Sequence, residues 1–215
     1  MNARGALATA IVAIFAAGPA WAHPAPGSDL PAFDYFVLSL SWSPAFCAAH
    51  PDDRAQCSQR RGFVAHGLWP EYANGGGPEH CGSDEVPGRE TIERTLSAMP
   101  DERLIRHEWV VHGACSGLSA HDYFVSLIRA VGSLSIPGEF DGATTQRLSA
   151  DEIAGKFLGA NPALQRRSLV LRCKGEQFEE LRVCLPPELK PVACGRGVHS
   201  QCRKGPLLIR AAPSQ

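Results

Sequence analysis

Two short segments of the chain carry residue types suited to proton transfer near neutral pH. The first is residues 66–70 (HGLWP) and the second is residues 107–115 (HEWVVHGAC). Histidine has an unperturbed pKa of about 6.5, so it can give and take a proton in this range. Because the segments together provide three histidines and a carboxylate, they contain the groups that acid–base catalysis near neutral pH requires.

The second segment lies in a predicted helix over residues 101–112, which has acids in its first turn and Gly113 at its end. Glu108 and His112 are four residues apart and share a helix face. We therefore expect the carboxylate, together with the helix dipole, to raise the pKa of His112. His107 lies roughly 140° around the helix from His112, and the two would flank a substrate at the helix end.

A metal-dependent hydrolase is the first alternative reading of these histidines. The zinc hydrolase pattern is His-Glu-x-x-His, whereas His107 and His112 are one residue too far apart. The chain also has no Cys-x-x-Cys, so a zinc ribbon or a thioredoxin-like redox motif is not expected. The sequence leaves open a copper or nickel site built from other histidines. We predict neither a metal nor another cofactor.

The N-terminal 22 residues have the pattern of a signal peptide. Arg4 supplies a positive charge, residues 7–17 are apolar, and residues 20–22 (AWA) fit the small-x-small cleavage rule. The apolar run is short for a membrane span, although an uncleaved anchor is the alternative. We predict a signal peptide over residues 1–22 and a single exported domain over residues 23–215, in the periplasm or secreted, with no membrane partner.

The net charge and the cysteine content further restrict the class of protein to which this chain could belong. Without the predicted signal peptide the formal net charge is about −2, unlike that of a protein that holds nucleic acid mainly through its phosphates. A transient nucleic-acid enzyme fits this charge better than a stable RNA-binding module. The eight cysteines are an even number in an exported chain, which indicates disulfides, and number alone leaves about 105 pairings open.

Hydrophobic patterns predict an α+β domain with a central, mostly antiparallel sheet and helices packed against it. Strands are expected at residues 33–42, 62–69, 169–172, 178–185 and 207–210. Helices are expected at residues 91–98 and 101–112 and after the capping residues Ser119 and Ser149.

Both histidine segments resemble the active-site segments of the ribonuclease T2 family, and residues 38–47 resemble its first strand and cysteine. The resemblance implies an exported endoribonuclease that cleaves single-stranded RNA without a metal. The reaction would proceed by transesterification through a 2′,3′-cyclic phosphate to a 3′-phosphate, and a monomer is expected.

The resemblance also implies roles for individual residues. His66 and His112 would be the acid–base pair, supported by Glu108, and His107 would contact phosphate. Trp69, with Glu71 or Tyr72, would form a base pocket by stacking on a nucleobase, and core packing is the alternative for this tryptophan. Trp109 is expected to pack in the core. The implied disulfides are Cys47–Cys57, Cys81–Cys115, Cys173–Cys202 and Cys184–Cys194.

The sequence departs from the family pattern at two positions. Val111 stands where the family usually has a lysine that would stabilise charge on the pentacoordinate phosphorus, and Arg106 is a candidate to supply that charge. Ser41 stands where many members have glutamine. The departure at Val111 leaves open a catalytically weak or inactive RNA- or protein-binding module of the same fold.

Overall fold

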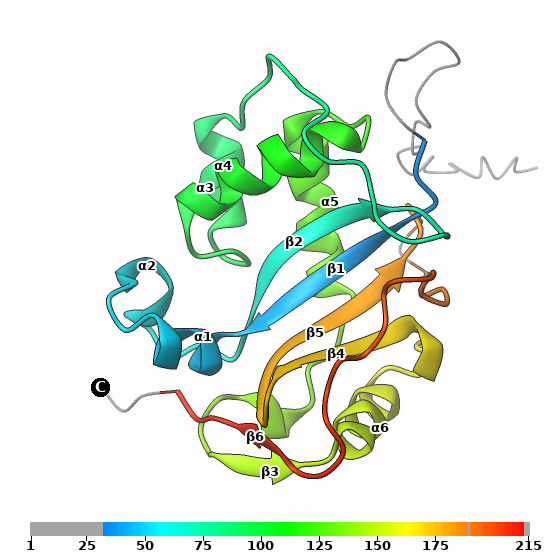
Figure 1. The fold of residues 1–215 in the computed structure, drawn as a ribbon. Coiled ribbons are helices and arrows are strands. Elements are labelled where there is room, and N and C mark those ends of the chain that lie inside the picture. Colours follow the sequence, from blue (N-terminus) through cyan, green and yellow to red (C-terminus); the bar gives the residue numbers. More distant parts are fainter. Residues whose placement is uncertain (1–31, 189, 213–215) are drawn as a thin grey trace, which may run out of the picture.

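A computed structural model describes residues 32–188 and 190–212, and the predicted signal peptide lies outside these residues. In the described chain, six strands form one sheet, in which β2, β1, β5, β6 and β3 follow one another and β4 pairs with β5 (Figure 1). The strands are β1 (Tyr35–Trp42), β2 (Phe63–Glu71), β3 (Gln146–Leu148), β4 (Leu169–Lys174), β5 (Gln177–Leu185) and β6 (Leu207–Ile209). The pairs within these residues are antiparallel except β5 with β6, so the predicted α+β class is confirmed.

Strand β1 is central, and its alternation separates the two faces of the sheet. Phe36, Leu38 and Leu40 belong to the main hydrophobic core with residues of α5 (Ala120–Gly132) and α6 (Ala150–Ala160). On the other face, Tyr35 and Val37 pack with Cys184 in a smaller cluster. Ser39 and Ser41 alternate with these core residues along β1, so their side chains lie on the face of the sheet opposite the main core.

The helices begin where the sequence provides capping side chains. Helix α3 spans Arg89–Thr95, and α4 spans Glu102–Val111 after Asp101, whose carboxylate accepts the Arg103 N–H at 2.8 Å. Ser119 caps α5, and Ser149 with Glu152 forms a capping box on α6. These side chains satisfy backbone N–H groups that a helix start leaves unpaired, which is why the predicted boundaries lie close to the observed ones.

Some short elements were not predicted. Strand β1 ends at residue 42 as expected, and Ser43 and Pro44 then begin helix α1 (Ser43–Ala49), because proline is tolerated in the first helical turn. Helix α2 (Arg54–Cys57) and strand β3 are similarly short. Three 3₁₀ turns, η1 (Gly113–Cys115), η2 (Gly138–Phe140) and η3 (Arg166–Ser168), complete the elements of the described chain.

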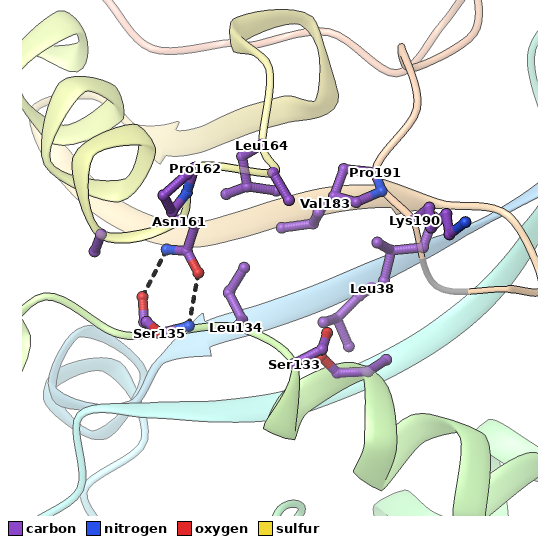
Figure 2. A pocket seen from close by; sticks show the side chains of 14 residues that line it. Leu38, Ser133, Leu134, Ser135, Asn161, Pro162, Leu164, Val183, Lys190 and Pro191 are labelled. Carbon is purple, nitrogen blue, oxygen red and sulfur yellow. Dashed lines mark hydrogen bonds between the residues drawn. The ribbon is translucent and has the colours of Figure 1, made fainter.

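Disulfides and polar side chains link elements that are distant in the sequence. The disulfides are Cys47–Cys57, Cys81–Cys115, Cys173–Cys202 and Cys184–Cys194, which is the pairing that the resemblance implied. Asn161, after α6, accepts the Ser135 N–H at 2.7 Å and donates to the Ser135 carbonyl at 2.8 Å (Figure 2). Leu38 and Val183 of the main core line the same pocket as Asn161, so the link between Asn161 and Ser135 lies on the core side of the sheet (Figure 2).

Among the described residues, no helix has both the length and the apolar character needed to cross a bilayer.

Candidate active site

A β-bulge places His66 on the sheet. In the antiparallel pair of β1 and β2, Ser39 lies opposite Gly67 and Leu40 lies opposite Ala65. His66 is therefore an extra residue on β2 without a partner on β1. A bulge of this kind redirects a side chain and increases local twist, and it is common beside active sites. The side chain of His66 is 37% exposed, so its ring remains open to a substrate.

Helix α4 brings Glu108 against the same strand. The Trp69 indole N–H donates to Oε2 of Glu108 at 2.7 Å, and Oε1 of Glu108 lies 3.9 Å from Nε2 of His66. Gly67 allows this approach, because a Cβ there would lie 2.2 Å from both Glu108 Oε2 and Trp69 Nε1. The glycine of the HGLWP segment is thus required by the packing of the site.

Both histidines lie close to Trp69. The centroid of the Trp69 ring is 5.2 Å from that of His66 and 5.4 Å from that of His112. Tyr123 holds the strand behind them by donating its hydroxyl to the Leu68 carbonyl at 2.9 Å. Trp109 packs against Tyr123 and is 2% exposed, so its predicted packing role is confirmed.

The predicted increase in the pKa of His112 is wrong. His112 is the residue that caps α4, with φ −120° and ψ −47°, so it does not continue the helix face of Glu108. The carboxylate of Glu108 points to Trp69 and His66 instead. Burial, followed by the positive charges of His107, His66 and His80, lowers the pKa of His112 to about 4. His112 is therefore neutral at neutral pH.

His66 has the opposite shift. Burial tends to lower its pKa, but the carboxylates of Glu180 and Glu108 outweigh burial and raise the pKa above its ordinary value. Burial also raises the pKa of Glu108 to about 7, against the opposing effects of His66 and the Trp69 N–H. Shifts in opposite directions on neighbouring histidines are the arrangement that separates an acid from a base at one pH.

Glu180 and Arg182 complete the site, and the sequence analysis missed both. They are two residues apart on β5, so they share a face, and Arg182 Nε donates to Glu180 Oε1. Oε2 of Glu180 lies 3.7 Å from Nδ1 of His66. The Arg182 guanidinium lies 4.6 Å from the centroid of the Trp69 ring. The available signal was a pair of opposite charges two residues apart in a predicted strand.

Two of the other predicted binding residues, His107 and Glu71, interact electrostatically with residues of this centre. His107 is exposed on α4 and acts electrostatically on His112. Glu71 ends β2, and burial raises the pKa of its carboxyl while Arg182 opposes the increase. Tyr72 follows in the loop, where its N–H donates to the Gly76 carbonyl at 2.7 Å.

The family lysine position and its suggested substitute do not supply a cation to the site. Val111 is 8% exposed, so an apolar side chain occupies the place. Arg106 donates to Glu102 at 2.8 Å on the exposed side of α4. Arg182 is instead the cation that the structure places in contact with the site. Among the described residues, no group of three or more histidine, cysteine, aspartate or glutamate side chains could hold a metal ion.

The fold and this arrangement define an α+β domain with a candidate acid–base site on its sheet. The chain belongs to the ribonuclease T2 family, whose model matches residues 33–194. A ribonuclease of Aeromonas hydrophila is 49% identical over 92 residues, which are 42% of this chain and 41% of the relative. A probable ribonuclease of Haemophilus influenzae is 33% identical over 153 residues, which are 63% of this chain and 53% of the relative. The matches thus span about half the length of these curated relatives or less.

Solved structures agree in fold. An RNase-related protein from Calystegia sepium superimposes with a TM-score of 0.65 at 23% identity, covering 85% of this chain and 98% of its own. RNase NT in complex with 5′-AMP superimposes with a TM-score of 0.58 at 21% identity, covering 82% of this chain and 100% of its own. At these identities the likeness establishes the fold alone.

Proposed function

We propose that this protein is an exported endoribonuclease that cleaves single-stranded RNA without a metal. One observation carries the proposal: two histidine rings have centroids 5.2 Å and 5.4 Å from that of Trp69, and their pKa values are shifted in opposite directions. One imidazole is suited to accept a proton while the other is suited to donate one. Cleavage of RNA by transesterification requires this pair of groups.

His112 is the base in this mechanism and His66 is the acid. Neutral His112 removes the proton from a ribose 2′-OH, and the resulting oxygen attacks the adjacent phosphorus. Protonated His66 gives its proton to the leaving 5′-oxygen, and the product carries a 2′,3′-cyclic phosphate. Water then opens the ring to a 3′-phosphate with the two roles reversed. DNA lacks the attacking hydroxyl, so the chemistry selects RNA.

Glu108 supports the acid rather than transferring a proton. Its contacts with Trp69 and His66 fix the tryptophan and favour the imidazolium form. His107, exposed beside His112, contacts a phosphate of the substrate. Trp69, with Glu71 or Tyr72 at the end of the strand, forms a pocket for a nucleobase, because stacking on aromatic rings is the common means of holding single-stranded RNA.

Export and the monomeric state form part of the same proposal. Disulfides form and persist in the periplasm and outside the cell, and all eight cysteines of this chain are paired in disulfides. The predicted destination is therefore periplasmic or secreted. A monomer without a membrane partner suffices, because one chain brings both histidines together.

The decisive experiment is digestion of yeast RNA by the purified protein in excess chelator. The wild type should produce 2′,3′-cyclic phosphate ends, while His66→Ala and His112→Ala should each lose at least about 10²-fold in rate. His199→Ala is the matched control, because it removes an exposed imidazole from the C-terminal segment. Activity abolished by the chelator would indicate a metallohydrolase instead.

A catalytically weak or inactive binding module is the second candidate, and Val111 at the lysine position favours it. This candidate predicts that the wild type binds a single-stranded oligonucleotide, or a protein, and produces no cyclic phosphate. Comparing binding with product formation in the same sample distinguishes the two functions. Cleavage that requires both histidines would eliminate the binding module.

A further inference from the structure

The imidazole of His66 lies between carboxylates from two different elements. Its Nδ1 is buried and has no hydrogen-bond partner among the described residues, and Oε2 of Glu180 on β5 lies 3.7 Å away. On the opposite side of the ring, Nε2 lies 3.9 Å from Oε1 of Glu108 on α4. A buried ring nitrogen without a partner has a free-energy cost that a small movement toward Glu180 would remove.

We propose that Glu180 is the positioning residue of His66: its carboxylate accepts the Nδ1–H and leaves Nε2 to carry the proton given to the leaving oxygen. The inference deepens the proposed ribonuclease function and rests on it. A carboxylate bonded to one nitrogen of a catalytic imidazole fixes the tautomer and the ring orientation and stabilises the imidazolium.

The sheet itself brings these two residues together. Strands β2 and β5 both pair with β1, so they are about 9–10 Å apart, and side chains from them meet only by leaning over β1. Glu180 lies opposite Ser41 and Arg182 lies opposite Ser39, so small side chains occupy the strand between. The bulge turns His66 toward this space. Serine at position 41 takes less room than the glutamine that the family resemblance led us to expect.

Glu180 also keeps its negative charge over the working pH range. Burial raises the pKa of its carboxyl, but His66 and then Arg182 outweigh burial and lower the pKa to about 2. Glu108, with a pKa raised to about 7 by burial, changes its protonation within that range. The two carboxylates therefore differ in role, because only Glu180 offers a constant charge to the imidazolium.

The surroundings of His66 supply the remaining charges that act on it. Arg182 on β5 lowers the pKa of His66, and Glu108 on α4 raises it. The cap residue of α4, His112, interacts electrostatically with His66. Asp53 and Asp101, which precede α2 and α4, line a pocket together with His66. A test must therefore change Glu180 and leave these groups in place.

The experiment follows the titration of the His66 ring by NMR in the wild type, in Glu180→Gln and in Glu179→Gln. Glu180→Gln should lower the pKa of His66 by about one unit or more, because an opposite charge near the ring is lost. The alkaline limb of its kcat profile should move to lower pH by the same amount, with KM little changed. Glu179→Gln removes the same charge from the next position of β5 and should leave both unchanged.

The outcomes separate the two proposals. If the wild type does not cleave RNA, the proposed function fails, while the titration in the resting protein still tests the Glu180–His66 pair. If the wild type cleaves RNA and folded Glu180→Gln keeps the wild-type pKa and alkaline limb, the inference is overturned. A uniform loss of rate without a shift would mean a structural role and would also overturn it.

A second variant covers the case in which Glu180→Gln does not fold. Glu180→Asp keeps the charge and the partner for Arg182, and it withdraws the carboxylate from His66 by one methylene. It should lower the pKa of His66 by less than Glu180→Gln would, and an unchanged pKa would overturn the inference.

Discussion

Replacing Gly67 with alanine should disrupt the site by steric conflict alone. An added Cβ would lie 2.2 Å from Oε2 of Glu108, 2.2 Å from Nε1 of Trp69 and 2.9 Å from Cδ1 of Trp69. These are the atoms of the 2.7 Å hydrogen bond between Trp69 and Glu108, so both ends of the bond must move. Free space is small for both side chains, because Glu108 is 1% exposed and the Trp69 ring lies close to His66, His112 and the Arg182 guanidinium.

The size of the effect follows from what is lost. A hydrogen bond to a charged group contributes about 1.5–3 kcal/mol, and forcing one extra carbon into a packed region costs about 1–3 kcal/mol. We therefore expect a loss of about 3 kcal/mol or more, which corresponds to a fall in Tm of about 6–12 °C for a domain of this size. Displacement of Glu108 and Trp69 by about 1 Å should also lower kcat by about 10²-fold.

Thermal unfolding and RNA cleavage by the same preparation measure both effects. Gly155→Ala in α6 is the matched control, because its added Cβ would have no atom within 4 Å apart from its chain neighbours and the backbone of its own helix. Alanine favours a helix over glycine, so this control should be as stable as the wild type or more stable by about 0.5–1 kcal/mol. A Gly67→Ala protein with the stability and activity of the wild type would refute the described contact between Gly67, Glu108 and Trp69.

Further predictions concern proton transfer and charge. The rate of RNA cleavage should fall below a pH of about 4, where His112 becomes protonated and cannot act as the base. The rate should also fall above the raised pKa of His66, where the acid has lost its proton. The assignment would be contradicted if replacing His66 removed the acidic limb of the pH–rate profile, or if replacing His112 removed the alkaline limb. Arg182→Gln should lower kcat by about 10-fold or more, if its guanidinium offsets charge on the phosphorus, and Arg182→Lys should retain more activity. Val111→Lys should raise kcat more than it lowers KM, and it should partly restore the activity of the Arg182→Gln variant. Val111→Met is the uncharged control. A stable lysine variant with unchanged kcat would show that the charge is already supplied.

The sequence alone predicted the class of fold because its signals are local. The alternation of residues 33–42 predicts a strand, and Ser119, Ser149 and Asp101 mark helix starts by the hydrogen bonds that their short side chains can form. The disulfide pairing followed from the resemblance rather than from cysteine spacing. Short elements such as α2 and β3 escaped prediction, because a few residues carry too little periodicity to distinguish them from a loop.

The candidate site was predicted in part for the same reason. His66, Glu108 and His112 lie in segments with recognisable composition, so the sequence predicts them as site residues, and in the structure all three lie close to Trp69. The contacts among these residues differ from the predicted ones. The helix spacing predicted that Glu108 would contact His112. Because α4 ends before residue 112, Glu108 contacts Trp69 and His66 instead.

What only the tertiary structure decided is the electrostatic environment of each histidine. Glu180 and Arg182 are more than 110 residues from His66 in the chain and reach it because β5 pairs with β1 and a bulge in β2 turns the ring toward them. Burial and charge at such contacts set the pKa of a group, and neither can be read from neighbours in sequence. The sequence thus identified residues that are able to carry protons, and the folded sheet sets the opposite pKa shifts of His66 and His112, on which their proposed roles as acid and base rest.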